Sequence, residues 1–351
     1  MPRSLFLPHI EAMSGYVPGE QPRGGTLIKL NTNENPYPPS PRALTALVAA
    51  AGEGLKRYPD PLGTVLRTAV ARKHGVDPSM VLAGNGSDDL LTIVTRAFVG
   101  PGDVAVYPEP SYILYQTLLE IQNARAAVAS FRDDWTLDAD AFATVARGAR
   151  LVFLANPNSP SGTTLSPAQV AAIAARLDCP LVVDEAYADF AETDCVALVR
   201  EYPHVIITRS FSKGYGLAGL RLGYLIARAE VVEGLTKVKD SYNCDALALA
   251  AGAAALDDQP YLATTRARIL ATRRRLADAL PALGPAVPAS AANFVWWPLG
   301  AAAEPTYRTL KDRGILVRLM RYPGRPDGLR ITVGTDDEID QLLAELRQIM
   351  T

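Results

Sequence analysis

One lysine lies in a loop whose composition favours chemistry over a simple surface charge. The segment is Ser210-Phe-Ser212-Lys213-Gly-Tyr-Gly-Leu-Ala-Gly-Leu-Arg221, and it follows a β-rich run. Most of the chain's lysines fall on predicted helices or in the N-terminal segment, where a solvated charge is the ordinary explanation. A lysine amine becomes a nucleophile and a proton carrier when burial lowers its pKa. Alone, this loop is only a weak indication, because short motifs often match by accident.

The glycines of the same loop also match a dinucleotide-binding pattern. Gly214, Gly216 and Gly219 fit G-x-G-x-x-G after a strand, which would indicate a nicotinamide-dependent dehydrogenase. In a true fingerprint the glycines open a helix whose N-terminus faces the pyrophosphate. Here Leu222–Ile226 is another strand-like run, which leaves no room for that helix. We interpret the match as accidental.

An acidic residue ends another apolar run, Leu181-Val-Val-Asp184-Glu-Ala-Tyr187. Asp184 could be an ordinary helix N-cap, which needs no cofactor. It could instead lie against a protonated ring nitrogen, because a carboxylate favours a nearby buried cation and keeps its pKa high. Tyr187 would then donate to an oxygen on the same ring.

A third segment predicts an anion site at a helix N-terminus. Gly86, Ser87 and Asp88 precede apolar residues at helical spacing. Free backbone N–H groups and the helix dipole attract an anion at such a position. Taken alone, Ser87 and Asp88 are ordinary caps. Together with the serines and the arginine of the lysine loop, they predict one half of a phosphate-binding cup.

Two further segments supply flat or amide-bearing side chains. Pro108-Glu-Pro-Ser-Tyr112 follows a strand and could lay an aromatic ring on a flat heterocycle, although a core tyrosine is an equally good explanation. Asn156-Pro-Asn158-Ser-Pro160 is first of all a turn. Asn156 or Asn158 could also offer an amide to a ring hydroxyl.

These motifs need a scaffold that brings strand ends together. The β-rich runs alternate with helical patterns, one of which covers Pro167–Leu177, and this alternation predicts a mostly parallel sheet covered by helices. Ligands collect where such strands end, and the polar motifs do follow strands. The predicted strands are Val81–Ala83, Val104–Tyr107, Leu151–Ala155, Leu181–Val183, Val205–Thr208 and Leu222–Ile226.

The two ends of the chain differ in composition from this central part. Residues 1–41 are rich in Pro, Gly and Asn, which predicts an extended arm rather than a helix. We expect a large domain over 42–257 and a smaller α+β domain over 258–351. The elements expected in the latter are helices at Tyr261–Leu283, Thr306–Arg313 and Asp336–Ile349, and strands at Asn293–Trp297, Ile315–Leu319 and Leu329–Val333.

Composition excludes several classes of function. The net charge of −2 argues against a surface built to bind nucleic acid. Three histidines and three widely spaced cysteines make neither a metal site nor a disulfide framework. No apolar run is long enough to span a bilayer, and no signal peptide is recognisable. We expect a cytoplasmic protein without a metal, a membrane contact or a nucleic-acid partner.

With these residues in view, the sequence resembles the fold-type I pyridoxal-phosphate-dependent aminotransferases, in the group that contains histidinol-phosphate aminotransferase. The likeness covers nearly the whole chain. Besides the lysine loop, it is carried by Gly15-Tyr-Val-Pro-Gly19, Leu30-Asn-Thr-Asn-Glu-Asn-Pro-Tyr37, Arg57-Tyr-Pro-Asp-Pro61 and Leu329-Arg-Ile-Thr-Val-Gly-Thr335.

The resemblance implies pyridoxal 5′-phosphate as cofactor and a role for each candidate residue. Lys213 would hold the cofactor covalently, with Asp184 at the ring nitrogen and Tyr187 at the ring hydroxyl. Tyr112 would stack on the ring. The phosphate end would be held by Gly86, Ser87, Asp88, Ser210, Ser212 and Arg221.

The same resemblance implies a homodimer, in which Tyr58 reaches the phosphate of the partner's cofactor. Arg330 and Arg318 would bind the substrate's phosphate, since planar guanidinium forks match phosphate oxygens. Tyr16 would close over the substrate from the arm.

Several positions depart from the common pattern of the family. Ser159 stands where asparagine usually precedes the second proline of the turn, so the amide for the ring hydroxyl would come from Asn156 or Asn158, with Asn156 favoured. Asp89 and Gly214 replace a usual glutamate and a usual alanine. Arg321 and Arg325 add positive charge between the two substrate arginines.

The implied reaction is transamination of L-histidinol phosphate with 2-oxoglutarate, which yields imidazole-acetol phosphate and L-glutamate in histidine biosynthesis. An aromatic aminotransferase or a threonine-phosphate decarboxylase would use almost the same cofactor residues. The fold also serves as a ligand sensor in transcription regulators, but the segment before Thr45 is too short and too rich in proline for a DNA-binding domain.

Overall fold

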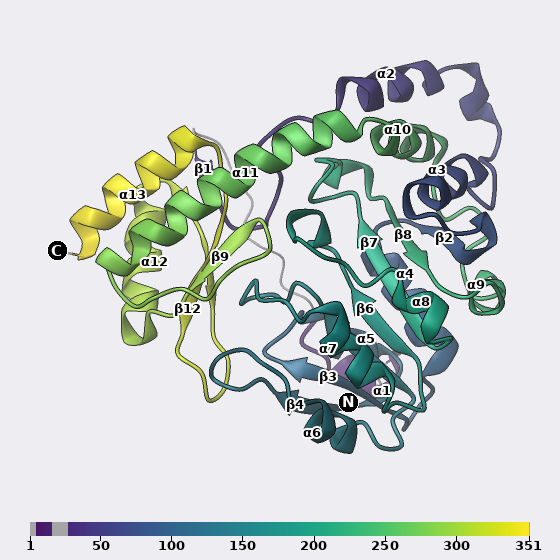
Figure 1. The fold of residues 1–351 in the computed structure, drawn as a ribbon, viewed down its shortest axis with the longest axis horizontal. Coiled ribbons are helices and arrows are strands. Elements are labelled where there is room, and N and C mark those ends of the chain that lie inside the picture. Colours follow the sequence, from purple (N-terminus) through teal and green to yellow (C-terminus); the bar gives the residue numbers. More distant parts are fainter. Residues whose placement is uncertain (1–4, 16–26, 351) are drawn as a thin grey trace.

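The computed structural model describes residues 5–15 and 27–350 and arranges them around two main sheets (Figure 1). The larger sheet lies on one side of the molecule and a small sheet on the other. The long helix α11 (Gln259–Ala279) runs from beside α10 (Ala246–Asp257) to the small sheet. The predicted α/β class is confirmed.

The larger sheet has seven strands within the described part of the chain, in the order β2-β8-β7-β6-β5-β3-β4. β8 is antiparallel to its neighbours β2 and β7, and the remaining pairs are parallel. The strands are β2 (Val81–Gly84), β3 (Val104–Glu109), β4 (Arg125–Ser130), β5 (Leu151–Ala155), β6 (Leu181–Asp184), β7 (Val205–Ser210) and β8 (Gly223–Ile226).

Sequence analysis did not predict β4. Its sequence, Arg-Ala-Ala-Val-Ala-Ser, has a single β-branched residue, and alanine has low β propensity. The strand forms at the edge of the sheet, where all six residues pair in parallel with β3. Tertiary pairing therefore overrides local preference here.

Helices cover both faces of this sheet. Along β5, Leu151 and Phe153 enter one core, whereas Val152 and Leu154 enter the other. Burial on both faces explains why the central strands are continuous apolar runs. The first face is covered by α4 (Ser87–Phe98), α5 (Leu114–Ile121) and α9 (Ala229–Thr236). The second is covered by α3 (Thr64–His74), α6 (Ala139–Val145), α7 (Pro167–Ala174), α8 (Leu198–Glu201) and α10 (Ala246–Asp257), with α2 (Pro41–Ala50) packed on α10.

The small sheet is antiparallel, in the order β11-β12-β9. Its strands are β9 (Phe294–Trp297), β11 (Arg318–Met320) and β12 (Gly328–Thr332), and they pack against α11, α12 (Ala303–Asp312) and α13 (Asp336–Met350). The predicted strand Ile315–Leu319 is divided in two. Its first half, β10 (Ile315–Leu316), pairs with a different partner from β11.

That partner is β1 (Ile28–Lys29), which comes from the N-terminal segment and runs parallel to β10. Leu30, directly after β1, is buried in the core of the small sheet. The prediction of an arm without helix is wrong in one place, because Pro8–Ala12 forms the short helix α1, with proline at its first position, where the missing N–H is no loss. The boundaries at 42 and 258 remain a prediction.

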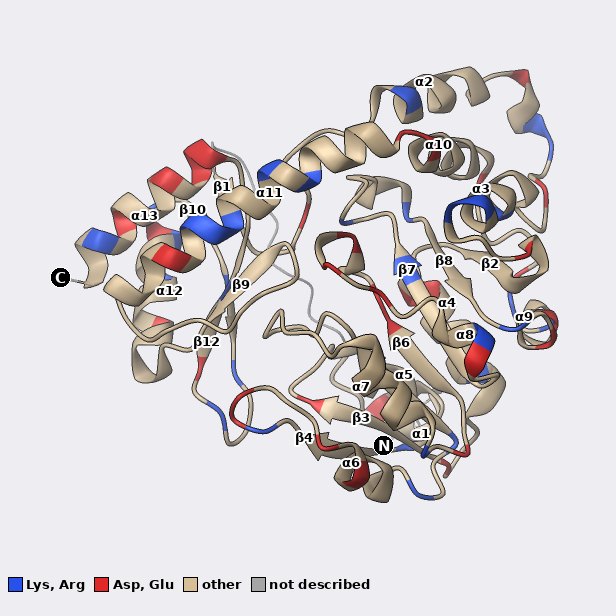
Figure 2. Cartoon of the chain, in the orientation of Figure 1, with Lys and Arg blue, Asp and Glu red and all other residues tan. Residues whose placement is uncertain are grey.

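Charged residues are interspersed over the surface helices (Figure 2). In the middle of the larger sheet, β6 ends at the carboxylate of Asp184 and β7 carries the cation Arg209. Asp184 and Glu185 point to opposite faces of the sheet, as successive strand residues do. Glu185 accepts a hydrogen bond from Nε of the buried Arg209 at 2.8 Å. Asp184 is therefore the one of these two carboxylates that lies on the other face of the sheet. No helix among residues 5–15 and 27–350 is both long and apolar enough to cross a bilayer.

Candidate active site

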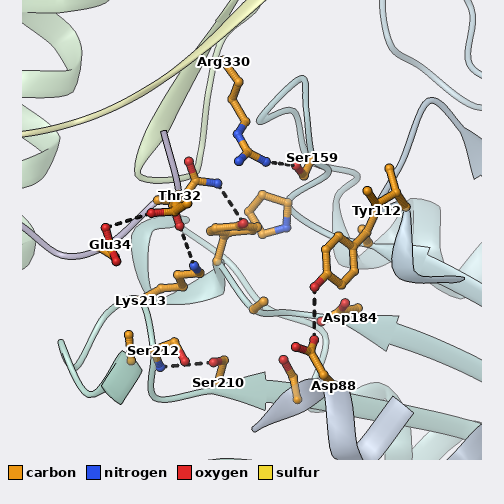
Figure 3. A pocket seen from close by; sticks show the side chains of 18 of the residues that line it. Thr32, Glu34, Asp88, Tyr112, Ser159, Asp184, Ser210, Ser212, Lys213 and Arg330 are labelled. Carbon is orange, nitrogen blue, oxygen red and sulfur yellow. Dashed lines mark hydrogen bonds between the residues drawn. The ribbon is translucent and has the colours of Figure 1, made fainter. Parts of the chain in front are cut away.

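A cavity of about 230 Å³ opens where the carboxyl ends of β5, β6 and β7 meet the small sheet and the segment after β1. Side chains from all of these elements converge on it (Figure 3). The predicted residues that line it are Ser87, Asp88, Tyr112, Asp184, Tyr187, Ser210, Ser212, Lys213, Arg221, Arg318 and Arg330. Within the described parts of the chain, no three His, Cys, Asp or Glu side chains gather as metal ligands do.

Lys213 is held at the cavity wall by the segment after β1. Its Nζ donates to the carbonyl oxygen of Thr32 at 3.1 Å, a contact drawn in Figure 3. The side-chain amide of Asn35 donates to the carbonyl oxygens of Lys213 and Gly214, at 3.0 and 2.9 Å. Both the amine and the backbone of the lysine are therefore fixed by residues far away in the sequence.

The electrostatic surroundings make this amine partly neutral near physiological pH. Burial lowers the pKa of Lys213 to about 8, and the positive charge of Arg330 acts in the same direction. The carboxylate of Glu34 opposes this shift. A neutral amine is a nucleophile and a base, so the structure provides the chemistry that sequence analysis expected of Lys213.

Asp184 is buried at the end of β6, and both of its carboxylate oxygens accept hydrogen bonds. Tyr115 Oη donates to Oδ2 at 2.9 Å, and Thr208 Oγ1 donates to Oδ1 at 3.1 Å. Burial raises the pKa of Asp184 to about 6, although both hydroxyls counteract the shift. A buried carboxylate of this kind favours a cation placed against it. Sequence analysis missed both hydroxyl residues.

Backbone N–H groups and an arginine form the anion-binding corner. α4 begins at Ser87, and its N-cap is Gly86, which has no side chain to cap the first N–H groups. Gly86 has φ +87°, and a Cβ on it would lie 2.7 Å from Arg221 Nη2. Arg221 Nη1 donates to Ser212 Oγ at 3.4 Å, and Nη2 lies 3.4 Å from Asp88 Oδ2. Helix dipole, arginine and serine together suit a phosphate.

Two tyrosines approach the cavity from different sides. Tyr112, on the loop before α5, donates from its hydroxyl to Asp88 Oδ1 at 3.1 Å (Figure 3). The hydroxyl of Tyr187 accepts from Asn33 Nδ2 at 2.9 Å. Because this bond uses the oxygen as an acceptor, the Tyr187 proton stays available for an oxygen in the cavity. Sequence analysis did not identify Asn33.

The two predicted substrate arginines lie directly opposite each other on β11 and β12, where Arg318 is the register partner of Arg330. Arg330 Nη1 donates to Ser159 Oγ at 3.0 Å and Nη2 to the carbonyl oxygen of Asn31 at 3.2 Å. Its Nε is buried and has no acceptor among the described residues. Like charges directly opposite each other in a sheet are unfavourable, so the pair indicates a site for an anion.

The turn asparagines lie elsewhere than predicted. Asn156 donates to the carbonyl oxygen of Leu165 and accepts from its N–H, at 3.0 and 2.8 Å. Asn158 Nδ2 donates to Pro110 and Ser161. The amide of Asn156 thus closes the turn, that of Asn158 also ties the turn to Pro110, and neither residue lines the cavity. These contacts do not support the role in binding a ring hydroxyl that we expected for one of them. Ser159, which departs from the family pattern, does line the cavity.

The remaining candidates lie outside the cavity. Tyr58 is 79% exposed and stacks on Tyr242, with ring centroids 4.5 Å apart. Arg321 pairs with Glu304 and Asp327. Arg325 lies over the ring of Trp135, which removes both extra arginines from the substrate assignment. Tyr16 lies outside the described residues.

Fold and site together define a cofactor-dependent transferase with a lysine at its centre. Residues 25–346 match the model of the family "Aminotransferase class I and II", and the chain belongs to that family. Two curated relatives are similar to this chain over nearly their whole length. A histidinol-phosphate aminotransferase of Rhodopirellula baltica is 50% identical over 98% of this chain and 96% of its own. Histidinol-phosphate aminotransferase 1 of a Nostoc species is 47% identical over 99% and 98%.

A solved structure agrees with these relatives. The histidinol-phosphate aminotransferase of Sinorhizobium meliloti, crystallised in complex with pyridoxal 5′-phosphate, superposes with a TM-score of 0.90. It is 31% identical to this chain and covers 99% of it, and the match covers 98% of its own length. The resemblance that the motifs predicted is thereby confirmed.

Proposed function

We propose that this protein binds pyridoxal 5′-phosphate and transfers the amino group of L-histidinol phosphate to 2-oxoglutarate, as a step of histidine biosynthesis. The full-length relatives named above support the reaction. The observation that carries it is the pair Arg318 and Arg330, which are register partners on β11 and β12 and both line the cavity.

The residues of the cavity fit the cofactor at each of its polar groups. The uncapped start of α4, with Arg221 and Ser212, would hold the phosphate. Asp184 would meet the ring nitrogen, Tyr187 would donate to the ring hydroxyl, and Tyr112 would lie on the ring face. Pyridoxal phosphate supplies an electron sink for the carbanion that forms when an amine loses its Cα proton.

Lys213 would act both as anchor and as proton carrier. At rest its amine would hold the cofactor covalently. When the amine of the substrate replaces it, Lys213 would be the base that takes the Cα proton of the substrate and returns it at C4′. The lowered pKa of about 8 suits this work at neutral pH. The Thr32 carbonyl gives the released amine a fixed acceptor at the cavity wall.

A panel of amine donors tests the substrate. With 2-oxoglutarate as acceptor, we expect kcat/KM for L-histidinol phosphate to exceed that for L-histidinol or L-phenylalanine by at least about 30-fold, because a desolvated charge pair contributes ~2 kcal/mol or more. L-Histidinol is the matched control, since it differs only by the phosphate. Similar values for all three donors would indicate an aromatic aminotransferase. Release of CO2 from threonine phosphate would indicate the decarboxylase.

We further propose a homodimer in which Tyr58 completes the partner's phosphate site. The exposed Tyr58–Tyr242 stack lies away from the cavity of its own chain and is available to a second copy. Exposed apolar side chains of the same region, Leu44, Val48, Leu55, Leu62 and Val65, favour an interface there.

Mixed dimers of a Lys213→Ala subunit and a Tyr58→Phe subunit test this arrangement. If Tyr58 acts across the interface, the hybrid has one intact site, and the high-affinity cofactor binding and activity that both parent dimers lack return to it. If Tyr58 acts within its own chain, every site of the hybrid carries one of the two substitutions, and mixing restores nothing.

We place the protein in the cytoplasm. Cys179, Cys195 and Cys244 are free and buried, and thiols in this state suit a reducing compartment. Its other partners would then be small molecules only, the amine donor and 2-oxoglutarate.

A further inference from the structure

Tyr115 lies beneath the cavity and contacts two of the residues that would hold the cofactor ring. It is fully buried on α5, one helical turn after Tyr112. Its hydroxyl donates to Asp184 Oδ2 at 2.9 Å. Its ring and that of Tyr112 form a T-shaped pair, with centroids 5.7 Å apart and an interplanar angle of 87°. One side chain therefore touches the carboxylate expected at the ring nitrogen and the aromatic ring expected on the ring face.

The ring of Tyr115 is itself fixed in place. It stacks on Phe153 of β5, with centroids 4.7 Å apart and planes 6° from parallel. Tyr107 of β3 packs against it from another side, 5.8 Å away. Close packing of this kind leaves the ring no alternative rotamer, because protein interiors hold few voids. The direction of its hydroxyl is set by the sheet.

The second oxygen of Asp184 is fixed by the neighbouring strand. Thr208 Oγ1 donates to Oδ1 at 3.1 Å, and Thr208 is the register partner of Asp184 on β7. Two donors on two oxygens define both the position and the plane of the carboxylate. Burial, followed by the charge of Asp184, raises the pKa of Tyr115 well above its usual value, so its hydroxyl keeps its proton as a donor.

We propose that Tyr115 is a positioning residue which, with Thr208, orients the Asp184 carboxylate toward the ring nitrogen of the cofactor and supports Tyr112 against the ring face. This inference rests on the proposed function for the identity of the ring. The contacts with Asp184 and Tyr112 belong to the chain itself.

The Tyr115→Phe variant removes the donor and keeps the ring. A hydrogen bond to a charged group is stronger than one between neutral groups. We expect the variant to bind pyridoxal phosphate about 10- to 100-fold more weakly when the cofactor-free protein is reconstituted. The pH range over which the absorbance of the bound cofactor changes should differ from that of wild type. The variant's kcat should fall, while its KM for the amine donor should stay within about threefold of the wild-type value.

Tyr107→Phe is the matched control. Tyr107 is a buried tyrosine beside Tyr115, but its hydroxyl donates to Gln116 and not to Asp184. This control should keep wild-type cofactor affinity and spectrum. Thr208→Val should repeat the effect of Tyr115→Phe, and Thr208→Ser, which keeps the hydroxyl, should restore it. Wild-type affinity and spectrum in both Tyr115→Phe and Thr208→Val would overturn the proposal.

A measurement on the cofactor-free protein separates this proposal from the proposed function. Tyr115→Phe removes one hydrogen-bond donor from Asp184. This removal costs more stability when Asp184 is ionised than when it is protonated. The loss of unfolding free energy should therefore be larger at pH 8 than at pH 5, on either side of the Asp184 pKa of about 6. Asp88 also faces Asp184 and raises its pKa, but it is unchanged between wild type and variant.

Equal losses at both pH values would overturn the role of the hydroxyl, whatever the cofactor. If the loss caused by Tyr115→Phe depends on pH but the wild-type chain binds no pyridoxal phosphate, the orientation of Asp184 by Tyr115 is supported and the proposed function is refuted.

Discussion

Replacing Lys213 with alanine should reduce transamination by at least about 10⁴-fold, because the same amine anchors the cofactor and carries the proton. Reduction of the loaded wild-type protein with borohydride should fix the cofactor on the peptide that contains Lys213. The variant should yield no such adduct. Activity with L-histidinol phosphate and mass analysis of the reduced peptides measure the two effects.

Two further variants test whether the reaction needs the amine of Lys213 itself, rather than a positive charge at this position or any lysine near the cavity. Lys213→Arg keeps a positive charge but cannot give up its proton, so it should be as inactive as the alanine variant. Lys29, which pairs with Glu34 and Thr32 at the same wall, is the nearby lysine to replace as a control. Lys29→Met should still trap the cofactor on Lys213. An adduct that persists on Lys29 in the Lys213→Ala protein would refute the assignment.

The second large effect is expected at Arg330. Replacing it with glutamine should lower kcat/KM for L-histidinol phosphate by about 30- to 1,000-fold, the range found when one side of a buried charge pair is removed. The affinity for pyridoxal phosphate should change less than about threefold, because the phosphate corner is formed by α4 and Arg221 on the opposite side of the cavity. Steady-state kinetics and cofactor titration give the two numbers.

The design includes a geometric control. Arg330→Lys keeps the charge but loses the planar fork, and its effect should fall between those of wild type and glutamine. With L-histidinol as donor, the glutamine variant should lose much less, since that substrate lacks the phosphate. Equal losses of substrate turnover and cofactor affinity would show that Arg330 belongs to the cofactor site.

Sequence patterns predicted the parts of the site that follow strands. Asp184 ends β6, Ser210 ends β7, and Ser87 begins the helix after β2, so each position could be inferred from an apolar run that stops at a polar residue. Thr208 carried a usable signal, because it lies two residues before Ser210 and shares its face of the strand. Tyr115 carried a weaker signal, one helical turn beyond Tyr112.

Contacts made through the backbone could not be predicted in this way. The acceptor for Lys213 is a carbonyl oxygen of Thr32, and its position depends on the pairing of β1 with β10. A two-residue strand has no periodicity to detect. At the asparagine turn, sequence analysis instead assigned a ligand-binding role to amides that bond within the protein. Amides in Asn-Pro turns often satisfy nearby backbone groups, and Asn156 does so with Leu165.

The pairing of β1 with β10 also imposes an order on the folding of the chain during its synthesis. The stretch between positions 29 and 315 takes roughly 15 to 60 s to translate at ~5–20 residues per second. During that time β1 waits on the ribosome without the strand that it joins in the structure. The seven-stranded sheet is fully synthesised well before then. The lysine loop is therefore synthesised long before Thr32 and Arg330 can take their places beside it. The cavity is completed only after β11 and β12 have left the ribosome.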